Sequence, residues 1–403
     1  MQGPGGSNFN FTEKDLTGFK FLKVILPMLS RLHEQGCKRD KAHNRKLHFD
    51  NYAAFVLLYF FNPIVKSMGG IVQASTLGKV QEKLEVSSTS KASFSEAPTV
   101  FEPDLLEAVV KELAGQVSVM KHDGRLDEVP GVITLVDGTA ITALAQLVGQ
   151  MGLGSDGKAN CSIKLHTRFD LLRGVPVAMD LTQASDSEVA SLMSHLEPDR
   201  CYVKDRGYAC FRLFQGIVDV GSHLVCRVRD NSAIHELLDD RPLSDEAKAA
   251  GILSDQVVWL GSDPKYKELK QPLRIIRIAC KKHKKRAHTG RGGPEQDEFL
   301  LIATDMLDLP AEVIALLYKS RWAVEIFFRF FKRMLNCRHL LSHREKGIKI
   351  QVFMAIIASL LIALFTGRKP TARTVEMMQF HFSGWATDEE VEAHIAKLKK
   401  QAE

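Results

Sequence analysis

The sequence predicts an α/β fold, in which a mixed-sheet core is interrupted by a β-rich insertion and preceded by an all-helical N-terminal domain. Three observations lead to this prediction. Apolar residues follow helical spacing up to about residue 120, short β-branched runs begin near residue 130, and strong helix formers return after about residue 310. Strands that alternate with a helix in one region are typical of a mixed α/β sheet.

The first 120 residues have the apolar spacing of helices. Apolar residues recur on one helical face between Phe19 and Leu32. Asp50 is expected to cap a second helix, which Pro63 ends, and a further helix is expected from Leu105 to Leu113. The Ser/Thr-rich stretch between these helices is expected to be a loop with a short helix.

The character of the chain changes near residue 130. The run GVITLVDG is a short strand that ends in Asp137 and Gly138. The runs SIKLHTRFD and VPVAMDLTQ are joined by the polar turn LLRG, which predicts a hairpin. Asp186 precedes a helical stretch, and CYVKDRGY is another short strand, ending at Asp205. This order of strand, hairpin, helix and strand predicts the mixed sheet.

The segment 212–310 is expected to be a β-rich insertion. Its candidate strands are SHLVCRVR, QVVWLG, PLRIIRIAC and EFLLIATD. It also contains the densest basic run of the chain, Lys281–Gly293, and a second basic stretch covers Cys37–His48. Each is explained as a solvated loop, or as a phosphate-contacting surface on a protein that processes nucleic acid.

The chain returns to helix after residue 310. AEVIALLYKSRWAVEIFFRFFKRML contains neither Gly nor Pro and predicts one long helix. The apolar stretch Val352–Phe365 is shorter than the roughly 20 residues of a membrane span, so we expect a buried core helix. The N-terminus lacks the features of a signal peptide, and we expect a cytoplasmic protein with no membrane partner.

Composition excludes few classes of protein. The 403 residues are 45% hydrophobic and 25% charged, as in ordinary globular proteins. Seven cysteines occur without a Cys-x-x-Cys pair, which argues against a zinc ribbon or a redox dithiol and favours reduced thiols. The net charge of +6 permits a polyanionic partner without establishing one.

Four polar residues of the long helix share one face. At 100° per residue they fall within about 60° of one another: Tyr318, Arg321, Glu325 and Lys332. Such a stripe is unusual in a helix that is otherwise rich in Phe, Ile and Leu. A simpler explanation stays open, because Arg321 and Glu325 at i, i+4 also suit a surface ion pair worth a few tenths of a kcal/mol.

Asp137 and Asp205 each follow a short apolar strand. A single aspartate at such a position is usually a turn or cap residue. Two of them on neighbouring strands, with Glu325 opposite, form a set of hard oxygen ligands suited to Mg²⁺ or Mn²⁺. Two such ions about 3.5–4 Å apart support phosphodiester chemistry.

Three motifs in this order resemble those of bacterial insertion-sequence DDE transposases. They are VDGTAITAL at 136–144, VKDRGY at 203–208, and Tyr-x2-Arg-x3-Glu-x6-Lys from Tyr318 to Lys332. The last is the signature of the group that cleaves DNA through a hairpin. The hairpin KLHTRFD…GVPVAMDLT and the segment HREKGIKIQVFMAIIA extend the resemblance over about 130–365.

The resemblance implies a ribonuclease-H-like core with a β-rich insertion between the second Asp and the Glu. It implies that Asp137 bridges two Mg²⁺ or Mn²⁺ ions, that Asp205 and Glu325 complete the metal site, and that these three residues are catalytic. Tyr318, Arg321 and Lys332 would then contact phosphates at the transposon end. The implied partners are double-stranded DNA, as inverted repeats and target, and a second copy of the chain on paired ends.

Cleavage through a hairpin requires a flipped base held by an aromatic ring. Trp259 is the candidate, although a buried β-sheet role is the commoner explanation for a Trp on such a strand. Trp322 is expected to pack, and His166, His339 and His343 are expected to have polar surface or core roles.

The expected parts are a helical N-terminal domain (1–125) that binds DNA ends, a core (126–211 and 311–370), the insertion (212–310) and a helical tail (371–403). The alternatives are a DNA-binding protein without catalysis and a ribonuclease-H-like nuclease or resolvase. The intact acidic residues argue against the first. The long insertion and the Tyr-Arg-Glu-Lys face argue against the second.

Overall fold

The computed structural model describes residues 24–35, 41, 44–141, 163–183, 186–261, 268–280, 299–336, 340–342, 344–369 and 371–400. The basic run Lys281–Gly293, part of the stretch Cys37–His48, His339 and His343 lie outside these ranges. The chain divides into two compact units, one made of residues 1–120 and 330–403 and the other of residues 121–329.

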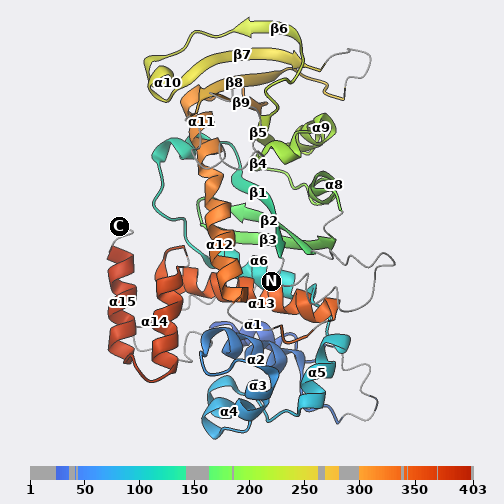
Figure 1. The fold of residues 1–403 in the computed structure, drawn as a ribbon, viewed down its shortest axis with the longest axis vertical. Coiled ribbons are helices and arrows are strands. Elements are labelled where there is room, and N and C mark those ends of the chain that lie inside the picture. Colours follow the sequence, from blue (N-terminus) through green and yellow to red (C-terminus); the bar gives the residue numbers. More distant parts are fainter. Residues whose placement is uncertain are drawn as a thin grey trace, which may run out of the picture. The chain divides into compact units, whose positions relative to one another are not determined.

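The first unit is helical throughout its described residues. Its helices are α1 (Leu26–Ser30), α2 (Phe49–Phe61), α3 (Met68–Ser75), α4 (Gly78–Leu84), α5 (Lys91–Val100), α6 (Leu105–Gln116), α13 (Glu345–Thr366), α14 (Ala372–Phe382) and α15 (Asp388–Lys400). Figure 1 shows α2 and α6 close to α13, and both of these helices contact α13. Sequence-distant helices thus share one core.

The helix α13 is the apolar centre of this unit. It has 22 residues and is long and apolar enough to cross a membrane by length and composition, yet 83% of its most apolar window is buried inside the protein. The expected buried helix is therefore confirmed, and it is longer than the apolar stretch Val352–Phe365. Its C-terminus is capped by Gly367 in the left-handed conformation (φ 63°), which glycine adopts without strain.

The start of α2 differs from the sequence-based expectation. His48 holds the N-cap position without a capping side chain, and Asp50 lies inside the first turn. Asp50 instead accepts a hydrogen bond from His33 Nδ1 at 2.8 Å. The expected cap was therefore wrong, because a tertiary partner binds the carboxylate.

The second unit is built around a mixed sheet. Its strands are β1 (Val132–Ile141), β2 (Ile163–Asp170), β3 (Val175–Gln183), β4 (Arg200–Lys204), β5 (His223–Val228), β6 (Ile234–Asp240), β7 (Ile252–Leu260), β8 (Leu273–Ala279) and β9 (Phe299–Thr304). Among the described residues these form one nine-stranded sheet in the order β3-β2-β1-β4-β5-β9-β8-β7-β6 (Figure 1).

The first half of this sheet contains the expected hairpin, together with β5, a strand that the sequence analysis assigned to the insertion. β2 and β3 form the antiparallel hairpin, and β1 pairs antiparallel with β2 and parallel with β4. β5, which follows the helix α9 (Phe211–Asp219), continues the parallel order beside β4. The mixed α/β fold is confirmed.

The second half of the sheet continues the first without interruption. β9 pairs antiparallel with β5, and β8, β7 and β6 follow as an antiparallel meander. Val228 on β5 lies opposite Leu301 on β9. The chain therefore leaves the first half of the sheet at the end of β5 and comes back beside that strand at β9.

Helices cover both faces of this sheet. α8 (Glu188–Met193) and α9 pack on one face, where Leu213, Phe214 and Ile217 join Tyr202 and other strand residues in the core. α11 (Ala311–Ser320) contacts β4, β5 and β7, and Figure 1 draws it on the other side of the strands. A 3₁₀ helix, η4 (Gly124–Glu128), contacts α11.

The long helix predicted from residue 311 is two helices. α11 ends at Ser320, and α12 runs from Trp322 to Asn336. At the junction, Arg321 N donates to Tyr318 O (3.2 Å) and Val324 N donates to Arg321 O (3.2 Å). These i, i+3 bonds tighten the backbone there, as in a 3₁₀ turn, so the prediction of one helix was wrong.

A buried ion pair ties β7 to β8. Arg274 donates from Nε to Asp255 Oδ1 (2.8 Å) and from Nη2 to Asp255 Oδ2 (2.7 Å). Its remaining nitrogen donates to the carbonyls of Met306, Leu307 and Leu309, after β9. Both side chains are almost fully buried, and the guanidinium has a partner on every nitrogen.

Candidate active site

The register of the sheet places Asp137 and Asp205 on neighbouring strands. The parallel pairing of β1 and β4 ends with Val136 opposite Lys204. Asp137 is the next residue of β1, and Asp205 directly follows the end of β4. Asp205 caps the short 3₁₀ helix η6 (Arg206–Tyr208), accepting a hydrogen bond from Gly207 N at 2.8 Å.

The sequence predicted that Asp137 lies at the end of its strand, and this prediction was wrong. β1 continues to Ile141, because Asp137 pairs with Thr167 and Gly138 with His166 on β2. Only β4, the parallel neighbour of β1, ends next to Asp137. The antiparallel hairpin therefore holds Asp137 in regular strand geometry at the point where one neighbour ends.

Arg321 brings Glu325 and Asp137 together. Its Nη2 donates to Glu325 Oε1 at 2.6 Å, and its Nη1 donates to Asp137 Oδ2 at 3.4 Å. Glu325 is in the first turn of α12, one helical turn after Arg321. The i, i+4 ion pair expected as the simpler explanation is present, and it extends to a residue of β1.

The environment of Asp137 disfavours its charge. Burial raises the pKa of Asp137 to about 7, Arg321 opposes that rise, and the nearby Asp205 and Glu325 add to it. A carboxyl group that is buried next to two like charges is typical of functional sites.

Two buried hydroxyl groups face this region without a hydrogen-bond partner. Thr167 Oγ1 is on β2 directly opposite Asp137, and Tyr208 OH is in the field of Glu188, Asp137 and Asp205. Both side chains are almost completely buried. Buried polar groups normally have partners, so these two hydroxyls near the aspartates suggest places that bind a polar ligand.

A fourth carboxylate lies close to both aspartate segments. Glu188 Oε1 is 2.9 Å from the position that a Cβ would take at Gly138, and Glu188 Oε2 is 3.4 Å from that position at Gly207. Lys164 on β2 forms an ion pair with Glu188 Oε1 at 2.6 Å. A side chain larger than hydrogen at position 138 would displace Glu188.

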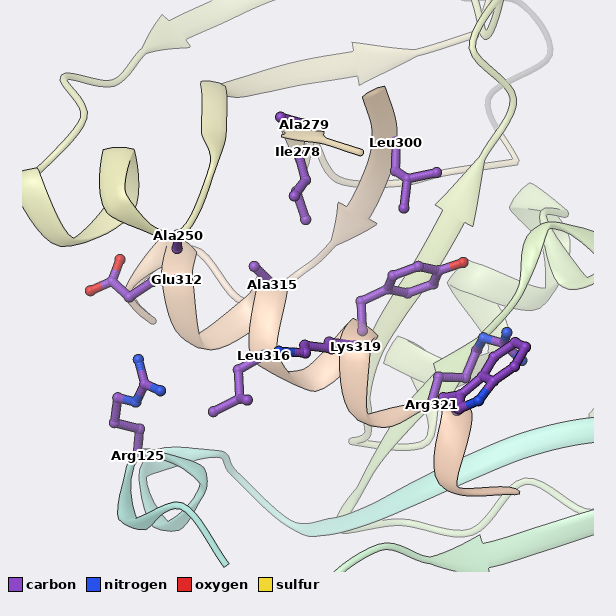
Figure 2. Close-up of a pocket in the computed structure, with 12 residues that line it drawn as sticks. Arg125, Ala250, Ile278, Ala279, Leu300, Glu312, Ala315, Leu316, Lys319 and Arg321 are labelled. Carbon is purple, nitrogen blue, oxygen red and sulfur yellow. The ribbon is translucent and has the colours of Figure 1, made fainter. Parts of the chain in front are cut away.

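A pocket of about 470 Å³ opens beside Arg321. Figure 2 shows Arg125 and Glu312 at one end of it and Arg321 at the other, with Ile278 and Leu300 along the wall from β8 and β9. The other lining residues are Ala250, Ala279, Ala315, Leu316, Tyr318, Lys319 and Trp322. The pocket therefore combines an apolar wall with several cations.

The structure brings together only some of the predicted phosphate-binding residues. Arg321 Cζ lies 5.9 Å from the centre of the Tyr318 ring. Lys332 is half-buried on α12, two turns after Glu325, in the part of that helix that belongs to the other unit. Trp322, which was expected to pack, is 53% exposed.

Trp259 lies away from the acidic residues. It is half-buried on β7, opposite Glu236 of β6. β5, β9 and β8 separate β7 from β4, which corresponds to roughly 19 Å across four strand spacings. His166 is buried, with Nε2 bonded to Thr182 Oγ1 at 2.7 Å, in agreement with the expected core role.

The acidic residues are held by side-chain cations. Among the described residues, no three His, Cys, Asp or Glu side chains converge closely enough to hold a metal ion as they stand. Arg321 binds Asp137 and Glu325, and Lys164 binds Glu188. The donor set of hard oxygens and the unpartnered hydroxyls nevertheless fit a divalent ion, which would compete with these cations.

Sequence reasoning missed Glu188, Lys164 and Tyr208. An acidic residue at the start of a short helix is ordinarily explained by the helix dipole, and Ser187 already caps α8. Tyr208 follows the DRG motif directly, so its position next to Asp205 was the one available signal.

Comparison with known proteins gives consistent results. The Transposase DDE domain family model matches residues 129–361. The transposase y4zB of Sinorhizobium fredii is 28% identical over 255 residues, 62% of this chain and 65% of its own length. The transposase for insertion sequence element IS5377 of Geobacillus stearothermophilus is 26% identical over 50% of this chain and 48% of its own length.

Two further matches have lower identity. A transposase for insertion sequence element IS4SA of Synechocystis is 22% identical over 73% of this chain and 75% of its own length. A solved structure of the piggyBac transposase synaptic complex with hairpin DNA has a TM-score of 0.44 and 10% identity, and the match covers 96% of this chain and 84% of that one.

Proposed function

The chain belongs to the Transposase DDE domain family, and on this premise we propose that it is the DNA transposase of an insertion sequence. It cleaves the ends of its element and joins the freed 3′-hydroxyl ends to target DNA. The observation that carries the proposal is the juxtaposition of Asp137 and Asp205 in adjacent register, with Glu325 linked to Asp137 through Arg321.

Asp137, Asp205 and Glu325 are the proposed metal ligands. These three carboxylates would together hold the two ions. Two Mg²⁺ or Mn²⁺ ions, when bound, activate the attacking oxygen and stabilise the leaving oxygen of the phosphodiester. The raised pKa of Asp137 supports this role, because a buried carboxyl among like charges favours a cation.

Arg321 and Tyr318 are the proposed phosphate contacts beside these ligands, with Lys332 further along α12. A guanidinium binds a phosphate bidentately, and a lysine binds it as a point charge. When Arg321 contacts a phosphate, its charge is shared with that phosphate rather than with the two carboxylates. DNA binding then favours metal binding by the same acids.

The remaining parts of the proposal concern the assembly. The helical N-terminal region binds the inverted repeats, and two copies of the chain hold paired ends. Trp259 stacks on a base that is flipped out during hairpin formation. This last role requires the DNA to reach from the acidic residues to β7.

The test is cleavage of a labelled DNA fragment that carries the end of the element flanking the gene, with MgCl₂. The wild type should produce nicks and hairpins, whereas Asp137→Ala should bind the fragment and leave it uncut. Asp219→Asn is the matched control, because Asp219 forms an exposed ion pair with Lys270 on the same unit. This control should cut like the wild type.

The outcomes separate the candidate functions. Cutting by Asp137→Ala would remove the triad from the mechanism. Nicks without hairpins, independent of the end sequence, would favour a ribonuclease-H-like nuclease over a transposase.

A further inference from the structure

Glu188 approaches both aspartate-bearing segments from α8. Its carboxylate lies against Gly138, where a Cβ would come within 2.9 Å of Oε1, and against Gly207, where it would come within 3.4 Å of Oε2. The glycine that follows Asp137 and the glycine of the DRG motif therefore make room for one carboxylate. Gly138 lies inside β1, so a turn does not explain why glycine occupies this position. Space for the Glu188 carboxylate does explain it.

The end of β4 lets Glu188 reach Asp205. Side chains alternate along a strand, so Gly138 opens to the sheet face opposite the Asp137 side chain. Beyond Lys204, however, β1 has no parallel neighbour. Asp205 Oδ1 and Glu188 Oε2 lie 3.1 Å and 3.4 Å from the same Cβ position at Gly207, so the two carboxylates flank one point.

Two buried groups around Glu188 lack a hydrogen-bond partner. Tyr208 is 1% exposed and its hydroxyl is unpartnered, while the charge of Glu188 acts on it more strongly than those of Asp137 and Asp205. His166 Nδ1 is also buried and unpartnered, and it lies 3.5 Å from the Cβ position at Gly138. Polar groups of this kind suit the oxygen atoms that surround a bound cation.

We propose that Glu188 is a fourth acidic ligand of the metal centre, placed beside Asp205 on the α8 side. The inference rests on the proposed function, since it requires divalent ions at Asp137, Asp205 and Glu325. A carboxylate in this position adds a hard oxygen donor. The alternative is a purely structural role, in which Glu188 serves only to bind Lys164 at 2.6 Å.

The experiment is a titration of the full-length chain with MnCl₂, followed by electron paramagnetic resonance of free Mn²⁺. Glu188→Gln keeps the size of the side chain and a hydrogen-bonding oxygen for Lys164 but removes the charge. We expect it to weaken Mn²⁺ binding by about tenfold or more. Glu197→Gln is the matched control, because Glu197 is also bonded to a cation, Arg200, on this unit, and it should bind like the wild type.

Lys164→Met separates a metal ligand from a structural ion pair. It removes the cation that competes for Glu188, so a ligand role predicts Mn²⁺ binding several-fold tighter than in the wild type. A structural role predicts unchanged or weaker binding. This variant also decides the question if Glu188→Gln fails to fold, which circular dichroism would reveal.

Asp205→Asn distinguishes the two proposals. If it weakens Mn²⁺ binding while Glu188→Gln does not, Glu188 is not a ligand and the triad stands. If Asp205→Asn binds as the wild type does, or the wild type shows no saturable binding, the metal site of the proposed function is wrong and the inference falls with it.

Discussion

Two arginines within residues 121–329 bind carboxylates in opposite ways. Arg274 and Asp255 form a bidentate pair whose side chains are 4% and 6% exposed, and three backbone carbonyls satisfy the rest of the guanidinium. Arg321 divides its bonds between Asp137 and Glu325, at 13%, 16% and 29% exposure. One of those bonds is long, at 3.4 Å.

The difference teaches what an exchangeable ion pair requires. The Arg274 cluster has no free donor or acceptor and no access for a ligand, so its ions stabilise only each other. The Arg321 cluster borders a pocket and unpartnered hydroxyls. Its guanidinium therefore has room to accept another anion, and its partly exposed carboxylates are accessible to another cation.

The largest expected effect comes from removing an acid of the open cluster. Glu325→Gln should lower cleavage of end-containing DNA by more than about 1,000-fold, because a metal ligand is lost, while the melting temperature changes little. Gel analysis of the cleaved product and a thermal scan measure the two quantities. A loss of folding instead of activity would show that this cluster is also structural.

The next effect concerns the closed cluster. Arg274→Met should destabilise the chain by about 3–5 kcal/mol, because Asp255 is left buried without its counter-charge. Urea unfolding measures this change, and Arg321→Gln provides the comparison, with an expected loss below about 1 kcal/mol. Equal losses of unfolding free energy in Arg274→Met and Arg321→Gln would contradict the proposed difference between the two arginines.

Lys204 extends the comparison to a buried cation without a carboxylate bonded to it. Its Nζ is unpartnered and lies 5.0 Å from the centre of the Phe214 ring. Burial lowers the pKa of Lys204 to about 8. Lys204→Met should therefore stabilise the chain at pH 7, by at most about 3.5 kcal/mol for a shift from 10.5 to about 8 at about 1.4 kcal/mol per pKa unit.

The pH dependence of this gain follows from the direction of the shift. The folded-state pKa lies below the ordinary value of 10.5, so between pH 8 and 10.5 the unfolded chain binds more protons at this lysine. Wild-type stability from this group rises with pH across that window, and the advantage of Lys204→Met shrinks. Urea unfolding at pH 7 and pH 9.5 measures the difference in stability between Lys204→Met and the wild type. The same difference at both pH values would contradict the expectation.

The smallest effect concerns metal affinity without DNA. Arg321→Gln removes the cation that binds Asp137 and Glu325, so Mn²⁺ should bind several-fold more tightly than to the wild type. The same paramagnetic titration measures this, with Arg125→Gln at the far end of the pocket as control. Weaker binding by Arg321→Gln would mean that the guanidinium positions the acids instead of competing for them.

The sequence predicted much of the fold because local patterns and tertiary structure agree there. The hairpin followed from two apolar runs and the turn LLRG, and both strands formed as expected. The break at Arg321 was not predictable, because it is a local tightening in a stretch without Gly or Pro. The cap at Asp50 failed because a distant histidine, His33, binds the carboxylate.

The candidate site was predictable only in part, for a similar reason. Asp137 and Asp205 were recognisable from their motifs, but their adjacency depends on the register between β1 and β4, in which paired residues such as Val136 and Lys204 are 68 residues apart in the sequence. No local sequence pattern indicates the role of Glu188, because its carboxylate lies against Gly138 and Gly207, which belong to other elements. Contacts of this kind are visible only in three dimensions.

The pairing of β5 with β9 has a consequence for how such genes diversify. The segment that contains β6 to β8 starts after Val228 on β5 and ends on β9, where Leu301 lies opposite Val228, so both ends of that segment meet at one place. A segment with this property can be replaced or shortened to a tight turn without breaking the pairing of β1 with β4. We therefore expect hybrids joined within residues 229–300 to fold more often than hybrids joined between β1 and β4.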